Sequence, residues 1–110
     1  MNDNEGKLTP KKHNKLVRDR IPEYIRQQGG RPVTHVADDL EYWLKLKAKL
    51  VEEVTEFLEK ENVEELADVY EVLDAIIEFK RYEQSVLRSV QTRKAQERGK
   101  FQKRIILDES

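Results

Sequence analysis

Apolar residues recur at helical spacing through the middle of the chain. Asp38 is typical of a helix N-cap, with Glu41 three residues later, and the pattern predicts an amphipathic helix from there to about Lys60. At 100° per residue, one arc of this helix holds Leu40, Trp43, Lys47, Leu50, Val51, Val54, Phe57 and Leu58. We expect this arc to form the core face, with Lys47 as its one charge.

A second long helix follows almost at once. Asn62 suits the N-cap of a helix that runs to about Tyr82, and so short a link predicts an antiparallel helical hairpin. The apolar residues of this helix spread over about 200°, which is wider than one partner helix covers. They are Val63, Leu66, Val69, Tyr70, Val72, Leu73, Ile76, Ile77 and Phe79. Part of this surface must meet the C-terminal helix or another subunit.

Shorter elements flank the hairpin. Residues 1–12 are polar and aperiodic, which predicts a mobile N-terminal arm. Pro22 fits the first turn of a short helix that ends at Gly29, and a further helix from about Glu83 to Arg98 ends at Gly99. Aliphatic and β-branched residues at 31–36 and 104–107 predict a minor two-strand pairing.

These elements predict an all-α fold in one domain, residues 13–110. Its centre is the antiparallel hairpin, and the wide apolar face of the second helix predicts a helix bundle on oligomerisation. The chain has no cysteine, which excludes disulfides and thiolate zinc sites. It shows neither a secretory signal nor an apolar run of the roughly 18–20 residues that a membrane span needs, so we expect a cytoplasmic protein that does not bind membranes.

Charge changes this picture because it is segregated. The 21 Lys and Arg residues nearly cancel the 22 Asp and Glu residues, leaving a formal charge of −1. Residues 51–78, however, carry 11 acidic side chains and 1 basic one. An acidic centre between two basic arms is unlike a nucleic-acid-binding protein, so no nucleic-acid partner is expected. The segregation suits a site that holds a cation and a polyanion together.

Four carboxylates gather at the predicted turn of the hairpin. Glu53 with Glu56, and Glu65 with Asp68, are spaced i, i+3, and antiparallel helices bring both pairs to the same end. Glu65 lies inside the apolar sector of its helix. Four oxygen donors from two helices match the needs of Mg²⁺, with Mn²⁺ as a possible substitute.

Each of these acids also has a purely structural interpretation. Glu53 and Glu56 have lysines four residues before and after them, respectively, as in ordinary surface ion pairs. Glu65 is placed as a capping-box residue, and Asp68 suits the dipole of a helix N-terminus. The acidic pattern alone does not choose between these interpretations and a metal site.

Three segments in the same order resemble a known group of enzymes. The two Glu residues at 52–53, Glu56, and the later Glu65-x-x-Asp68 are similar to the signature of the all-α nucleoside triphosphate pyrophosphohydrolases, the MazG and phosphoribosyl-ATP pyrophosphatase superfamily. Residues 14–23, 98–101 and 104–107 resemble the ends of its small, single-domain house-cleaning branch. The resemblance spans residues 14–107, although Lys100 stands where that branch often has a second glycine.

The resemblance implies a magnesium-dependent reaction. It implies that Glu53, Glu56, Glu65 and Asp68 bind the metal, and that Glu52 is a supporting acid or the general base, so that Glu52 and Glu53 are the candidate catalytic residues. The superfamily cleaves between the α and β phosphates of a nucleoside triphosphate, giving a monophosphate and pyrophosphate. Its members are commonly dimers or tetramers, which implies a homodimer or homotetramer here.

The phosphates of such a substrate need cationic partners. The candidate substrate-binding residues are taken from the basic side chains of the two terminal regions that carry the resemblance: Lys15, Arg18, Arg98, Lys100 and Lys103. The alternative for each of them is an ordinary solvated charge. The alternative for the whole chain is a non-catalytic helical module that binds nucleotide or a protein partner.

Overall fold

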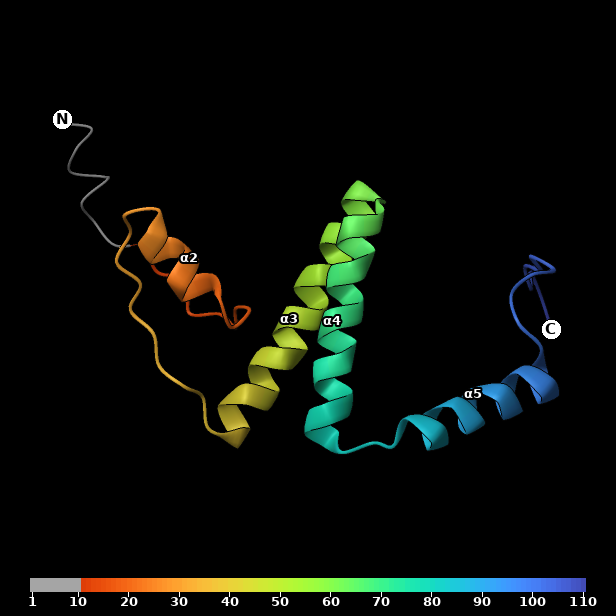
Figure 1. Ribbon diagram of the computed structural model, residues 1–110. Coiled ribbons are helices and arrows are strands. Elements are labelled where there is room, and N and C mark those ends of the chain that lie inside the picture. The colour runs from red at the N-terminus through yellow and green to blue at the C-terminus, as the bar shows by residue number, and fades with distance from the viewer. Residues whose placement is uncertain (1–10) are drawn as a thin grey trace.

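The computed structural model describes residues 11–110 and is all-helical in that range (Figure 1). Its elements are α2 (Ile21–Gln27), α3 (Asp39–Lys60), α4 (Val63–Lys80) and α5 (Gln84–Arg98). The predicted all-α fold is confirmed. The N-terminal arm predicted at residues 1–12 lies almost wholly outside the described residues. None of the described helices is both long and apolar enough to cross a membrane.

Capping side chains set the starts of the two long helices at the positions that the sequence predicts. Asp38 accepts a hydrogen bond of 2.9 Å from the backbone N–H of Glu41, and Asn62 accepts one of 2.9 Å from that of Glu65. Between these helices the chain turns through Glu61, which adopts left-handed backbone angles (φ 53°). This turn is short enough to force α3 and α4 into the antiparallel hairpin.

The hairpin has a very small buried core. Leu46 on α3 and Val72 on α4 are the buried hydrophobic residues, 1% and 8% exposed. At the open end of the hairpin, Trp43 stacks on Phe79 with ring centroids 5.9 Å apart, and Tyr42 meets Phe79 edge-on at 5.3 Å. These contacts confirm Trp43 as a packing residue and hold the N-terminal half of α3 to the C-terminal half of α4.

The core face of α3 differs from the predicted arc. Leu46, which the arc left out, is its most buried residue, whereas Leu40, Val51 and Leu58 are largely exposed, with Val51 68% exposed. The predicted arc combined residues of two apolar stripes on α3, and only one of these stripes packs against α4. The hairpin stripe follows the 3–4 spacing of a helix-packing seam through residues 46, 50, 53 and 57.

The predicted pairing of residues 31–36 with 104–107 is wrong. Both segments are irregular within the described chain, and Val33, Val36 and Ile105–Leu107 are exposed. The physical reason is distance: the first segment precedes α3 and the second follows α5, which points away from the hairpin on the opposite side (Figure 1). A strand without a neighbour has no partner for its backbone groups.

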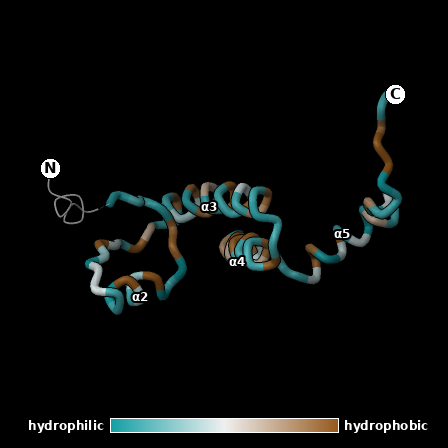
Figure 2. Tube along the Cα trace, turned by 90° about the horizontal axis from the view of Figure 1, so that it is seen from above, coloured by the Kyte–Doolittle hydropathy of each residue, from teal (hydrophilic) through white to brown (hydrophobic). Residues whose placement is uncertain are grey.

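The chain is extended. Its radius of gyration is 19.7 Å, and its principal extents are 62 × 33 × 25 Å. A compact domain of this length has a radius of gyration of about 13 Å. Seen from above, α5 runs outward from the α3–α4 hairpin rather than across it (Figure 2).

Candidate functional site

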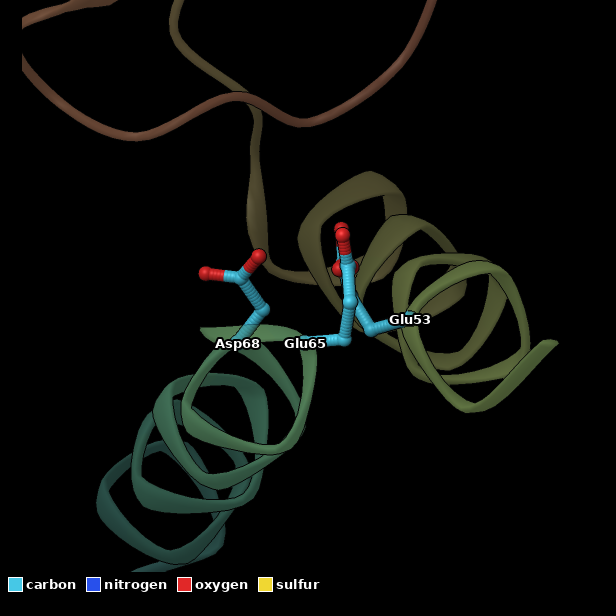
Figure 3. Close-up of side chains that lie close together, drawn as sticks. All are labelled: Glu53, Glu65 and Asp68. Atoms are coloured by element: carbon cyan, nitrogen blue, oxygen red, sulfur yellow. The ribbon is translucent and has the colours of Figure 1, made fainter. Parts of the chain in front are cut away.

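Three carboxylates from two helices converge near the turn of the hairpin. Glu53 comes from α3, and Glu65 and Asp68 come from α4; one carboxylate oxygen of each lies within 4.8 Å of the others. All three side chains point to the same side of the hairpin (Figure 3). The side chains of Glu53 and Glu65 are only 12% and 16% exposed. The cluster is therefore partly withdrawn from solvent.

Helical periodicity explains why these carboxylates meet. Glu53 lies seven residues after Leu46, and Glu65 lies seven residues before Val72. Seven residues are two turns, so each carboxylate occupies the same face of its helix as the buried residue. The seam that packs the hairpin therefore ends in two acidic side chains, and Asp68 flanks them one turn along α4.

Cationic side chains neutralise much of this charge. Lys49 Nζ lies 3.3 Å from Glu53, and Lys60 Nζ lies 3.2 Å from Glu56 and 3.4 Å from Glu65. Hydrogen bonds to Glu56 and then Glu65 raise the pKa of Lys60. The two i, i+4 pairs expected from the sequence are thus present. Glu65, instead of completing a capping box, faces Lys60 across the turn.

Residues 14–18 cross the acidic side of the hairpin from α3 to α4. The Lys45 ammonium donates a 2.7 Å hydrogen bond to the carbonyl of Asn14, and Lys15 forms a 3.0 Å ion pair with Glu52. Arg18 then reaches α4, where it lies 2.7 Å from Asp68. Of the predicted phosphate-binding residues, Arg18 therefore contacts the acidic cluster, and Lys15 contacts Glu52 beside it.

Glu52 faces this crossing segment rather than the interior of the hairpin. Its partners are Lys15 and, at 3.5 Å, Lys49. The hydrogen bond from Lys15 is the main cause that lowers the pKa of Glu52, and burial opposes it. Glu52 is therefore ionised at neutral pH.

The remaining predicted site residues lie elsewhere. Glu56 is bound to Lys60 and stands outside the converging group of three. Arg98 ends α5, and Lys100 and Lys103 follow it, so all three lie on the arm that points away from the hairpin (Figure 1). Within one described chain, the basic C-terminal residues and the acidic cluster are apart.

Two contacts of the site escaped the sequence analysis. Lys60 joins Glu56 to Glu65 across the turn, and Arg18 lies 3.8 Å from Glu71 as well as near Asp68. The position of Lys60, immediately before a two-residue turn, was the available signal for the first contact. The second depends on a loop crossing the hairpin, which no local pattern indicates.

Two hollows in the described part of the chain lie away from the carboxylates: one is lined by residues of α2 and Arg20, and the other lies at the start of α3 around Leu44.

Comparison with known proteins gives one partial similarity. The chain is 61% identical over 41 residues to a protein of Mycolicibacterium smegmatis (strain ATCC 700084 / mc(2)155) that is described only as uncharacterized. The matched region is 37% of this chain and 42% of that relative, so the chain spans less than half the relative's length. No family model matches the chain. No solved structure matches it either.

Proposed function

We propose that this protein is a magnesium-dependent nucleoside triphosphate pyrophosphohydrolase of the cytoplasm. It would cleave the α–β phosphate bond to release a nucleoside monophosphate and pyrophosphate, either clearing noncanonical nucleotides or acting on a substrate like phosphoribosyl-ATP. The observation that carries the proposal is the convergence of Glu53, Glu65 and Asp68 within 4.8 Å. The order of the three similar sequence segments supports it.

The donor set fits a hard divalent cation. Carboxylate oxygens are the ligands that Mg²⁺ and Mn²⁺ prefer. Glu53, Glu65 and Asp68 would hold the ion, and Glu56 would join them by leaving Lys60. When bound, the ion would supply charge neutralisation of the phosphates and a lowered pKa for water.

The crossing segment supplies the cations that phosphates need. The side chains of Lys15 and Arg18 are about half exposed, so each can exchange its carboxylate partner for a phosphate oxygen. Arg18 offers a planar guanidinium that binds two oxygens at once. In this proposal Glu52, which is ionised and pairs with Lys15, would accept a proton.

The direct test is pyrophosphate release from a panel of normal, modified and phosphoribosylated nucleotides, with Mg²⁺ or Mn²⁺. We expect Glu53→Gln and Asp68→Asn to lower turnover by at least about 100-fold, because each removes an anionic ligand. Glu59→Gln is the matched control, since Glu59 is exposed on α3 and has no ion pair among the described residues. No turnover of any nucleotide, or full turnover in both site variants, would overturn the proposal.

One observation favours a second candidate, a non-catalytic nucleotide-binding or protein-interaction module. Every carboxylate of the cluster already has a Lys or Arg partner, as in a structural charge network. This candidate predicts tight nucleotide binding by calorimetry without any product. The same nucleotide panel therefore separates the two functions.

A further inference from the structure

Residues 14–18 lie on the acidic face of the hairpin and are held there mainly by ion pairs. Lys15 pairs with Glu52 at 3.0 Å, and Arg18 pairs with Asp68 at 2.7 Å. The side chains of Lys15 and Arg18 are 46% and 56% exposed, and ion pairs this exposed are individually weak. Figure 3 shows the chain of this segment crossing above the three carboxylates. The segment can therefore leave the hairpin without unfolding it.

The chain on either side of these ion pairs adds little to their hold. Helix α2, which follows the segment, has no buried residue in the described chain. Before the ion pairs, one contact does not depend on a carboxylate: the Lys45 ammonium donates a hydrogen bond of 2.7 Å to the carbonyl of Asn14. Asn14 has left-handed backbone angles (φ 47°), which asparagine adopts more readily than most residues. Asn14 is thus placed as a pivot for residues 15–18.

Arg18 shares its acid with the candidate cation site. Asp68 is one of the three converging carboxylates, whereas Glu53 and Glu65 have lysine partners from α3 itself, Lys49 and Lys60. Arg18 comes from 50 residues away in sequence and is the partner that a flexible loop supplies. A divalent cation bound by the three carboxylates would take up the negative charge that holds Arg18 and would repel its guanidinium. Arg18 and the cation therefore compete for Asp68.

We propose that residues 14–18 form a cation-responsive strap. Binding of a divalent cation by Glu53, Glu65 and Asp68 displaces Arg18 from Asp68, and the strap swings about Asn14 and offers Arg18 to a polyphosphate. The inference rests on the proposed function for its cation site, but the movement of the strap requires no turnover. Because the two equilibria are linked, the factor by which Arg18 weakens cation binding is also the factor by which the cation weakens the hold of Arg18.

Calorimetry with Mg²⁺ alone tests the competition. We expect Arg18→Gln to bind Mg²⁺ about fivefold more tightly than the wild type, because the competing charge is gone and the polar group remains. Arg20→Gln is the matched control: it removes the same charge two residues later, from an exposed side chain without an ion pair among the described residues. Its Mg²⁺ affinity should stay within about twofold of wild type.

Three calorimetric results would overturn the inference. One is unchanged or weaker Mg²⁺ binding by Arg18→Gln, and another is equal tightening in both variants, which would show a general effect of net charge. The third is the absence of Mg²⁺ binding by either the wild type or Arg18→Gln.

A spin label follows the strap directly. The chain has no cysteine, so a nitroxide can be attached at Val17→Cys, a strap position that is 37% exposed. Mg²⁺ should raise the mobility of this nitroxide, with a midpoint at the dissociation constant that calorimetry gives for the labelled protein. Val33→Cys carries the control label, at a position 96% exposed in the loop before α3, and its mobility should not change. A Val17 label that is already fully mobile without Mg²⁺, or that saturating Mg²⁺ leaves unchanged, would overturn the strap.

A polyphosphate probe tests what the freed strap binds. We expect Arg18→Gln to bind the magnesium complex of tripolyphosphate at least about fivefold more weakly than the wild type, although it binds Mg²⁺ alone more tightly. A merely structural role of Arg18 would move both affinities in the same direction. Unchanged binding of the complex would overturn the assignment of Arg18 to the polyphosphate.

Failure of the strap and failure of the proposed function are distinguishable. If the nucleotide panel shows no turnover while Mg²⁺ mobilises the Val17 label, the proposed function fails and the strap stands. If nucleotides are turned over while Mg²⁺ leaves the label unchanged, the function stands and the strap inference fails.

Discussion

Glu53 and Glu65 are carboxylates placed in the packing seam of a helical hairpin. Two carboxylates about 5 Å apart repel by about 3 kcal/mol at an effective dielectric near 20. Lys49 and Lys60 offset part of this repulsion for Glu53 and Glu65, and Arg18 does so for Asp68. A bound cation would offset the repulsion that remains between these partly buried carboxylates.

The ion pair of Glu52 with Lys15 makes stability depend on pH. Because the folded state lowers the pKa of Glu52 from 4.5, the pair stabilises the protein above that pH and loses its effect as pH falls through the folded-state pKa. We expect Glu52→Gln to lower the free energy of unfolding by less than about 1 kcal/mol at pH 7, because the pair is partly exposed. Urea unfolding of both proteins at pH 7 and near pH 3 measures this difference.

The difference should shrink as the pH falls through the lowered pKa of Glu52 and vanish below it, because the protonated wild-type carboxyl resembles glutamine. Glu59→Gln, which changes a carboxylate without an ion pair in the described chain, should show no deficit at either pH. An equal deficit for Glu52→Gln at both pH values would contradict an ion-pair origin.

At the scale of the elements, capping and the two-residue turn position the site. Asn62 caps the helix that carries Glu65 and Asp68, and its hydrogen bond goes to the backbone of Glu65 itself. The cap therefore fixes both the start of α4 and the direction in which its first acidic side chains point.

Loss of this cap should destabilise the hairpin. We expect Asn62→Ala to lower the free energy of unfolding by about 1 kcal/mol, because the N–H of Glu65 loses its partner. Thermal or urea unfolding followed by circular dichroism measures the change. Asn62→Ser is the control, since serine is also a good N-cap, and its stability should remain close to wild type. Equal losses in the two variants would show that capping is not the cause.

At the scale of the whole molecule, the unusual feature is how little one chain buries. Among the described residues, Leu46 and Val72 are the buried hydrophobic side chains, while Leu40, Val51 and Leu58 on α3 and Val86 and Leu87 on α5 remain exposed. A core this small offsets little of the conformational entropy that folding removes. We therefore expect this apolar surface to be covered when the chain associates.

A charge on the exposed apolar stripe of α3, the second seam formed by Leu40, Val51 and Leu58, should weaken the association that we expect. We expect Val51→Glu to weaken self-association by at least about 100-fold, because an unpaired carboxylate would be buried between subunits. Light scattering or sedimentation over a range of concentrations measures it. The control is Ala48→Glu, which introduces the same carboxylate at an exposed position of α3 outside the stripe of Leu40, Val51 and Leu58. If Val51→Glu associates as the wild type does, the second seam is not the interface.

The sequence by itself determined the helices, the caps of the two long ones, the tight turn and the convergence of acidic side chains from α3 and α4, although it also included Glu56, which stands outside the group. These features depend on local rules: a 3.6-residue period, hydrogen bonds three residues apart and a link too short for any arrangement but a hairpin. Only the tertiary structure decided which of the two apolar seams of α3 is buried, because both satisfy the same helical period. It also decided that residues 14–18 cross the acidic side, that Lys60 links two acids, and that α5 points away. These outcomes are set by competition between contacts distant in sequence, which no local period encodes.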